Sequence, residues 1–295
     1  MTITTEDQFN LGVELRRLRT GAGHTVRSAA PLVGVSGASI SRIENGQRPC
    51  SDDEIENLLA TYQASADQRA QVLRLLEAAK AGSATAEGVW WMRFADVLPA
   101  GYLEYIRLEN FAKRSTEAQT TVLPGLLQTE KYAREITNRT YVGPSAQEVI
   151  FARLERQKRL TDDPPLSFTG IITEACLRTE VGGPYLMRDQ MKHLVELARR
   201  ENVEIIVIPF ASAAGAGLAS TFTLFEEVGR WQSDDQPTKT ALSEEGAILM
   251  RAITWDRTYV ERARNVINHL RQAGLDPDQS VEVIQQYESF WGERD

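Results

Sequence analysis

The sequence predicts a small all-α head of five helices joined to a larger α+β body. Up to residue 81, apolar residues recur at the spacing of amphipathic helices. Beyond residue 89, β-branched apolar runs alternate with helical stretches, a pattern typical of a sheet packed against helices. The residues between these parts are small or polar, so they bury little surface and bend easily. We therefore expect two domains, 1–81 and 89–295, with a linker over 82–88.

The centre of the head carries two short helices separated by a glycine. Thr25 and Ser36 stand where an N-cap hydroxyl accepts a hydrogen bond from a free backbone N–H. Gly34 lies between the helices, where a residue without Cβ permits a left-handed turn. The expected buried stripe consists of Val35, Ile40 and Ile43, and the expected outer face consists of Gly37, Ala38, Ser41 and Arg42. A helix with one packed side and one polar side is suited to the major groove of DNA.

The other three helices of the head follow from the same apolar spacing. They are expected over 9–22, 52–62 and 65–81. The second of them begins with three acidic residues, which suit the positive end of a helix dipole.

The stretch from Ser36 to Gly46, followed by Arg48 and Pro49, resembles a known family signature. It is similar to the Ser-x-x-x-Ile-Ser-Arg-Ile-Glu-x-Gly pattern of phage-repressor-like (Xre-type) helix-turn-helix regulators, and the resemblance covers about residues 9–64. The resemblance implies a lambda-repressor-like head that binds a double-stranded DNA operator. It also implies a homodimer, because one such head reads only about half a turn of DNA.

The resemblance and the helix N-termini together indicate which residues contact DNA. Residues 37, 38 and 42 correspond to positions that face base edges. Of these three, Arg42 alone can donate two hydrogen bonds to the edge of a guanine. The expected DNA contacts are Thr25, Arg27, Ser36, Gly37, Ala38, Ser39, Ser41, Arg42, Asn45 and Arg48. The chain departs from the family at Val26, where a glutamine is common, and at Pro31, which removes a backbone hydrogen bond within the helix. We expect Arg27 to compensate for Val26.

The resemblance also implies a structural ion pair between Arg19 and Glu44, an arginine late in the first helix and a glutamate late in the third. Glu44 is the single acidic residue between positions 16 and 48, a stretch that holds six arginines. The whole chain has a net charge of −8, which argues against a protein that coats nucleic acid without specificity. A small basic head on an acidic body instead favours a specific regulator.

Other features exclude several classes of protein. There is no apolar run of membrane-spanning length and no signal peptide, so a cytoplasmic protein is expected. Cys50 and Cys176 are too few for a disulfide framework or a zinc site, and both should be free thiols. The three histidines are scattered singly, so neither a metal nor another cofactor is expected.

No catalytic motif is recognisable. Residues 182–184 are not a phosphate-binding loop, because no Gly-Lys-Ser/Thr follows them. A Ser-His-Asp triad assembles from distant positions, so sequence order leaves it open. His193 and His269 each lie in a helical stretch beside a leucine and outside any motif. We therefore expect a protein without enzymatic activity.

The body is expected to alternate strands and helices. The expected strands are 168–173, 203–209 and 221–228, and the expected helices are 102–118, 130–139, 145–161, 186–200, 255–273 and 277–291. The basic stretch 153–159 could contact nucleic acid, but internal Glu–Arg pairing favours a solvated helix face.

The body also resembles a C-terminal domain, without assigned activity, of actinobacterial regulators. The motifs that carry this resemblance are Trp90-Trp91, 123–133 (Leu-Pro-Gly-Leu-Leu-Gln-Thr-x-x-Tyr-Ala), Arg156-Gln157, 174–178 and 207–210. Its members include WhiJ-like and antitoxin-like regulators, which are typically encoded beside a small partner protein of the BldB type. The resemblance implies control of DNA binding through such a partner. The candidate partner or ligand residues are Trp90, Trp91, Gly125, Leu126, Gln128, Tyr132 and Arg156.

Two functions stay open for the body. It either receives a small partner protein or binds a small molecule, as in many two-domain bacterial repressors. The small-residue loop 211–219 suits closure over a ligand, whereas the family resemblance favours the partner. Trp90 and Trp91 could stack on a ligand, although adjacent aromatics after a linker are more often an anchor between domains. We expect the body to form the dimer contact and the helix over 65–81 to connect the body to the head.

Overall fold

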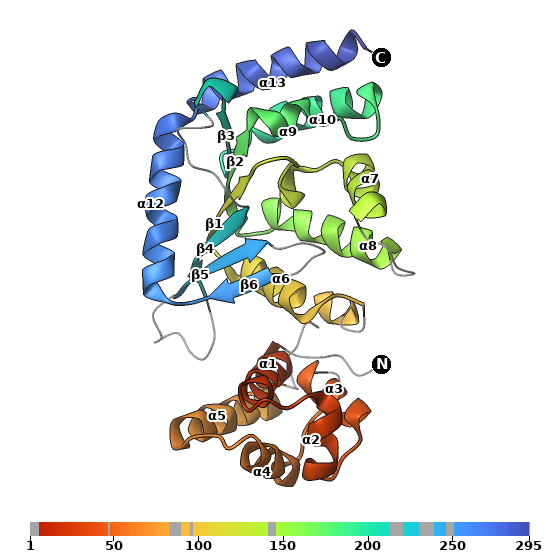
Figure 1. The fold of residues 1–295 in the computed structure, drawn as a ribbon, viewed down its shortest axis with the longest axis vertical. Coiled ribbons are helices and arrows are strands. Elements are labelled where there is room, and N and C mark those ends of the chain that lie inside the picture. Colours follow the sequence, from red (N-terminus) through yellow and green to blue (C-terminus); the bar gives the residue numbers. More distant parts are fainter. Residues whose placement is uncertain are drawn as a thin grey trace. The chain divides into compact units, whose positions relative to one another are not determined.

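The computed structural model describes residues 6–46, 48–82, 90–94, 97–140, 146–212, 221–229, 239–245 and 251–294. The chain divides into two compact units, Met1–Ala95 and Asp96–Asp295, here called the head and the body (Figure 1). Of the expected linker 82–88, only Gly82 lies within the described residues, where it ends the last helix of the head.

The head contains the five helices that the apolar spacing predicts. They are α1 (Glu6–Gly21), α2 (Val26–Val33), α3 (Gly37–Glu44), α4 (Asp52–Thr61) and α5 (Ala66–Gly82), followed by the short 3₁₀ helix η1 (Trp90–Phe94). Helix α1 packs against α3 and α5, and α2 packs against α3 and α4. All five helices bury their apolar stripes in one core, in which Leu15, Ile40 and Ile55 are fully enclosed. The core therefore holds α3 by its apolar side.

Local sequence explains why α2 and α3 begin and end where they do. The Thr25 hydroxyl accepts a hydrogen bond from the Ser28 N–H at 3.1 Å, and the Ser28 hydroxyl accepts one from the Thr25 N–H at 2.9 Å. The Ser36 hydroxyl accepts a hydrogen bond from the Ser39 N–H at 3.1 Å. Gly34 ends α2 in the left-handed conformation, with φ of 79°. Each predicted cap is thus present.

The body is built on one six-stranded mixed sheet in the order β3-β2-β1-β4-β5-β6. The strands are β1 (Arg114–Gln119), β2 (Ser167–Thr173), β3 (Val203–Ile208), β4 (Phe222–Val228), β5 (Lys239–Glu245) and β6 (Arg251–Thr254). β1, β2 and β3 run parallel to one another, and β4, β5 and β6 pair in antiparallel fashion. This combination of a sheet and covering helices confirms the expected α+β class.

Helices cover both faces of this sheet (Figure 1). They are α6 (Ala100–Phe111), η2 (Gly125–Leu127), α7 (Glu130–Thr140), α8 (Ala146–Arg156), η3 (Gln157–Leu160), α9 (Glu174–Arg178), α10 (Pro184–Leu197), α12 (Arg257–Ala273) and α13 (Pro277–Gly292). Helix α12 buries Val260, Ile267 and Leu270 against one face. The other face packs against α6, α10 and α13, which contribute Tyr105, Met191 and Trp291 to a second core.

The C-terminal part of one predicted helix of the body is wrong. We expected a helix over 102–118, but α6 ends at Phe111 and residues 114–119 form strand β1 in the middle of the sheet. The strand reads Arg-Ser-Thr-Glu-Ala-Gln, so it lacks the apolar alternation by which strands are recognised. β5 and β6 were likewise not predicted, since neither is an apolar run.

Polar contacts inside the body explain how β1 occupies a central position. Glu117 and Gln119 lie buried on the face that packs against α6. The Tyr105 hydroxyl donates to Glu117 Oε2 at 3.3 Å, and Gln119 Nε2 donates to Glu117 Oε1 at 2.7 Å. The Tyr105 hydroxyl also lies 3.3 Å from the Thr223 hydroxyl on the adjacent strand. Hydrogen bonding among these groups offsets the loss of water around them.

Candidate DNA-binding interface

Helix α3 presents a small, polar and partly basic surface to solvent. Ile40 and Ile43 are buried in the head core, whereas Ala38 and Arg42 are exposed. Gly37, Ser39 and Ser41 are half-buried on the same helix. Arg42 Nε lies 3.4 Å from the Ala38 carbonyl oxygen, one turn earlier along α3. The outer face therefore carries one long basic side chain among small neighbours.

The N-termini of α2 and α3 are both exposed at their caps. Thr25, Arg27 and Ser36 face solvent. Free N–H groups and the helix dipole make such termini suited to a phosphate oxygen. Within the described part of the chain, neither Arg27 nor Arg42 forms an ion pair, so both guanidinium groups are available to DNA. Val26 is half-buried and packs against the head core.

Arg19 and Glu44 meet as a buried bidentate ion pair. Arg19 Nε donates to Glu44 Oε1 at 2.6 Å, and Arg19 Nη2 donates to Glu44 Oε2 at 2.8 Å. The Glu44 residue is only 3% exposed. Its hydrogen bond raises the pKa of the Arg19 guanidinium above the ordinary value. Arg16, which sequence reasoning missed, adds a second cation at 3.4 Å from Glu44 Oε2.

Two of the expected phosphate contacts have partners inside the head. The Asn45 side chain is buried and accepts a hydrogen bond from Arg16. Arg48 Nη2 donates to Glu54 Oε1 at 2.7 Å, and Glu54 Oε2 accepts from the Ser51 N–H at the start of α4. The hydrogen bond from Arg48 lowers the pKa of the Glu54 carboxyl. Contact of Asn45 and Arg48 with DNA stays a prediction.

The tryptophans expected to bind a partner or ligand lie in η1. Trp91 is buried and Trp90 is half-buried. Their rings meet edge to face, with centroids 5.7 Å apart, and the Trp90 ring makes a similar contact with Phe94.

The other candidate partner or ligand residues surround a buried loop of the body that contains η2. Leu126, Gln128 and Tyr132 are almost fully enclosed. Gln128 Nε2 donates to the Leu123 carbonyl oxygen at 2.8 Å, which closes the loop on itself. The Leu123 N–H in turn donates to the Tyr132 hydroxyl at 3.4 Å.

Two glutamines outside this loop hold its backbone. Gln157 Nε2 donates to the carbonyl oxygens of Gly125 and Gln128, at 3.0 and 2.7 Å. Gln190 Nε2 donates to the Leu127 carbonyl oxygen at 2.7 Å, and Gln190 Oε1 accepts from the Thr129 N–H at 2.7 Å. Gln157 belongs to a motif that the sequence already singles out, whereas no local signal identifies Gln190.

Arg156 lies in the interior of the body beneath Gly125. Its Nε and Nη2 donate to the two carboxylate oxygens of Glu109 at 2.7 and 2.8 Å, and its Nη1 donates to the Tyr102 hydroxyl at 2.7 Å. Burial alone would lower the pKa of Arg156, but the adjacent Glu109 carboxylate raises it well above its ordinary value. A β-carbon at Gly125 would lie 3.3 Å from Arg156 Nη1, so a glycine suits this close approach. A role of these residues toward a partner or ligand stays a prediction.

Several other expectations concern features elsewhere in the chain. Cys50 and Cys176 are free and buried. No cluster of His, Cys, Asp and Glu within the described ranges could hold a metal ion. Across those same residues, no helix has the length and apolar character needed to cross a membrane. Of the expected mobile loop 211–219, residues 213–219 lie outside the described residues.

Comparison with known proteins supports the two-part reading. Residues 10–72 match a helix-turn-helix domain family. The matched stretch contains α2, α3 and α4 in full and parts of α1 and α5. Residues 102–286 match a domain of unknown function, DUF5753, which spans nearly the whole body. No curated protein and no solved structure matches the chain. The helix-turn-helix is a DNA-binding module, so the head is that of a DNA-binding regulator. The chain belongs to the DUF5753 family, and in this chain the DUF5753 domain follows a helix-turn-helix head.

Proposed function

We propose that this protein is a sequence-specific transcriptional regulator that reads DNA through α3. The observation that carries the proposal is the two-sided character of that helix. Ile40 and Ile43 fix it in the head core, and Ala38 and Arg42 stand free on the outer side. Small residues allow close approach to the floor of a major groove, where Arg42 can donate two hydrogen bonds to guanine.

The capped starts of α2 and α3 supply the phosphate contacts of this proposal. Thr25, Arg27 and Ser36 lie exposed at these two helix ends. Phosphate contacts set the register of a protein on the duplex, and base contacts supply its specificity. Since one Arg42 contacts few bases, part of the specificity comes from the shape and deformability of the operator.

For the body we propose a protein-interaction role in a homodimer. Two heads on a two-fold operator give the affinity that one half-site lacks, and the body is the larger unit available to join them. A small partner protein, of the kind encoded beside Xre-type antitoxin-like regulators, would then change the head spacing and the operator affinity. This coupling must be reciprocal, so operator DNA would change the affinity for the partner by the same factor.

A small-molecule ligand in the body is the second candidate, and one feature favours it. Ser115 and Ser243 each bury a hydroxyl that has no hydrogen-bond partner among the described residues. Ser243 pairs in register with Thr223, and Thr223 pairs with Glu117, so three strands present polar groups in one row. Polar groups that converge in an apolar interior are typical of ligand sites.

We further propose that the protein is not an enzyme. Burial raises the pKa of the Cys50 and Cys176 thiols to about 12, so neither is a thiolate nucleophile near neutral pH. Of the buried arginines in the body, Arg156 is engaged by Glu109 and Tyr102, and Arg107 is paired with Glu104.

Selection from a random duplex library by the full-length protein tests the DNA-binding proposal. We expect enrichment of a sequence with two-fold symmetry. Ala38→Asp places a carboxylate on the outer face of α3 and should abolish enrichment, while Ala60→Asp, at an exposed position of α4, should not. Enrichment of the same sequence by Ala38→Asp would refute reading through α3.

Two measurements separate the candidates for the body. Sedimentation of the full-length protein should give a dimer. Co-purification with a small protein of the BldB type should give a complex whose affinity changes on addition of operator. Failure of such a protein to bind would favour the small-molecule candidate and would leave the proposed role of α3 in reading DNA unchanged.

A further inference from the structure

The first residues of α2 and α3 lie side by side on the head. A β-carbon at Gly37, the first residue of α3, would lie 3.4 Å from Cγ1 of Val26, the first residue of α2. Val26 is half-buried, so part of its side chain packs against the head core and the rest reaches the surface beside Gly37. The starts of the two helices therefore share one surface.

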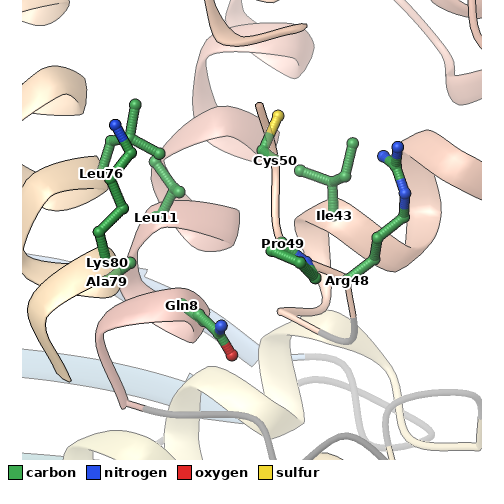
Figure 2. Close-up of a pocket in the computed structure, with 9 residues that line it drawn as sticks. All are labelled: Gln8, Leu11, Ile43, Arg48, Pro49, Cys50, Leu76, Ala79 and Lys80. Carbon is green, nitrogen blue, oxygen red and sulfur yellow. The ribbon is translucent and has the colours of Figure 1, made fainter. Parts of the chain in front are cut away.

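The inner side of α3 is a different surface. Figure 2 shows Ile43 on that side, across a small hollow from Leu11 of α1 and Leu76 of α5. The described residues that line this hollow include neither Ala38 nor Arg42, and both of these are exposed. The outer side of α3 is thus free to meet another molecule.

The hydroxyl groups at the two helix starts are used as caps. Ser36 Oγ accepts a hydrogen bond from the Ser39 N–H at 3.1 Å and lies 2.9 Å from Ser39 Oγ. Thr25 Oγ1 accepts from the Ser28 N–H at 3.1 Å, and Ser28 Oγ accepts from the Thr25 N–H at 2.9 Å. Each cap bond directs the hydroxyl toward its own helix backbone, so these groups hold the helix starts in place.

The side chains that remain at this surface are small and apolar. Val26 presents methyl groups, Gly37 has no side chain, and Ala38 presents one exposed methyl group. None of the three side chains can donate or accept a hydrogen bond. An amino or carbonyl group of a base pressed against them would lose water without gaining a partner. The feature of the major groove that suits this surface is the C5-methyl group of thymine.

We propose that Val26 and Ala38 form an apolar contact that reads the methyl group of one thymine in each half-site. This inference rests on the proposed reading of DNA through α3, and it names a base that the helix selects. Gly37 allows the close approach, because a side chain there would fill the space beside Val26.

The geometry of α3 indicates where this thymine lies. Ala38 and Arg42 both face outward and are separated by one helical turn, which is about 6 Å along the axis for four residues. Neighbouring base pairs of a duplex are about 3.4 Å apart. The thymine therefore lies within about two base pairs of the guanine that Arg42 contacts.

Thymine and uracil differ by this methyl group alone, so deoxyuridine tests the contact. The affinity of the full-length protein is measured for the operator selected from the random library, and then with each thymine replaced in turn by deoxyuridine. At one thymine of a half-site the affinity should fall about fourfold, the loss expected for one buried methyl group. Replacement of the other thymines should have a smaller effect.

Variants place the contact on the protein. Val26→Ala and Ala38→Gly each remove part of the apolar surface, so each should bring the affinity ratio of the thymine operator to the deoxyuridine operator closer to one. That ratio compares two DNAs with the same variant, so a partial loss of folding cancels. Val35→Ala is the matched control and should keep the native ratio. Val35 is also half-buried against the head core, but it lies in the turn between α2 and α3.

The thymine contact and the reading role of α3 can fail separately. If no duplex is enriched, or if Ala38→Asp enriches the same sequence as the native protein, reading through α3 is refuted and the thymine contact with it. If Ala38→Asp abolishes enrichment but every deoxyuridine operator binds as tightly as the thymine operator, the thymine contact alone is overturned. It is equally overturned if Val26→Ala and Ala38→Gly both keep the native ratio, or if Val35→Ala lowers the ratio as much as they do.

Discussion

Gly12 lies directly against the backbone carbonyl of Glu44, where α1 packs on the end of α3. A β-carbon at position 12 would come within 2.4 Å of the Glu44 oxygen and 2.7 Å of the Ile43 oxygen. Real β-carbons do not approach backbone atoms so closely, and the atoms of a helix end cannot move aside without shifting the helix. The absence of a side chain at Gly12 therefore sets how deeply α3 packs into the head.

Gly12→Ala should destabilise the head. Alanine is favoured over glycine within a helix by about 1 kcal/mol, but the contact with α3 causes overpacking that costs about 1–3 kcal/mol or more. We expect a net loss of up to about 2 kcal/mol in the free energy of unfolding, measured by urea titration followed by circular dichroism. Gly21→Ala is the control, because a β-carbon there meets nothing within 4 Å. Equal stability of the two variants would contradict the tight contact.

Glu44→Ala should unfold the head and leave the body folded. The change removes the one carboxylate that Arg19 and Arg16 share, and Arg19 then stays buried without a counter-charge. Breaking such a buried pair costs about 3–5 kcal/mol. Calorimetry should show the loss of one unfolding transition. Glu56→Ala breaks the exposed pair with Arg69 and should cost less than about 1 kcal/mol.

Arg42→Ala should reduce specificity for the operator more than it reduces stability. Arg42 is exposed, and among the described residues its side chain donates a hydrogen bond to the Ala38 carbonyl oxygen of its own helix. Loss of a bidentate contact to guanine removes about 1–3 kcal/mol of discrimination at one base pair in each half-site. Affinities for the operator and for random duplex, measured at one salt concentration, give the ratio that should fall. An unchanged ratio would exclude Arg42 from base reading.

Arg27→Ala should instead weaken binding to all sequences. Arg27 is exposed in the first turn of α2, beside the Thr25 cap. Loss of one phosphate contact lowers the magnitude of the slope of log affinity against log salt by about 0.9. Arg74→Ala, at an exposed position of α5 away from α2 and α3, should leave the slope unchanged. Equal slopes for Arg27→Ala and the native protein would remove Arg27 from the interface.

The body should lose stability in mildly acidic solution through His193. Burial lowers the pKa of this half-buried histidine below its ordinary value of 6.5, although Glu196 opposes the change. The unfolded chain therefore takes up the proton first. Stability is complete above pH 6.5 and falls as the pH drops from there toward the folded-state pKa.

Two histidine variants test this dependence by chemical unfolding at a series of pH values. His193→Gln should remove the loss of stability that begins as the pH falls below 6.5, before carboxylates such as Glu204 take up protons, whereas His269→Gln, at an exposed position of α12, should retain it. Retention of the full pH dependence in His193→Gln would show that another group is responsible.

Local signals explain why the head could be predicted from the sequence. The Thr25 and Ser36 caps act over three residues, and Gly34 ends α2 by its own backbone conformation. The roles of Asn45 and Arg48 could not be predicted in the same way. Their partners, Arg16 and Glu54, come from other helices, and no short pattern identifies such pairs.

The contact between Arg16 and Glu44 could have been predicted from the sequence. Arg16 and Arg19 stand three residues apart on α1, so both lie on one face of that helix. In the body, by contrast, apolar runs identified β2, β3 and β4, whereas β1 escaped because its neighbours determine its conformation.

The polarity of β1 has a consequence for synthesis of the protein on the ribosome. This central strand pairs with β2 on one side and with β4 on the other, and β4 is made only after β2, α10 and β3. During that interval one edge of β1 has no partner. Unpaired edges of apolar strands attract other chains, while charged and hydroxyl-bearing residues resist such association. The polar sequence Arg-Ser-Thr-Glu-Ala-Gln thus protects the partly synthesised body from association with other chains until β4 is available to pair with β1.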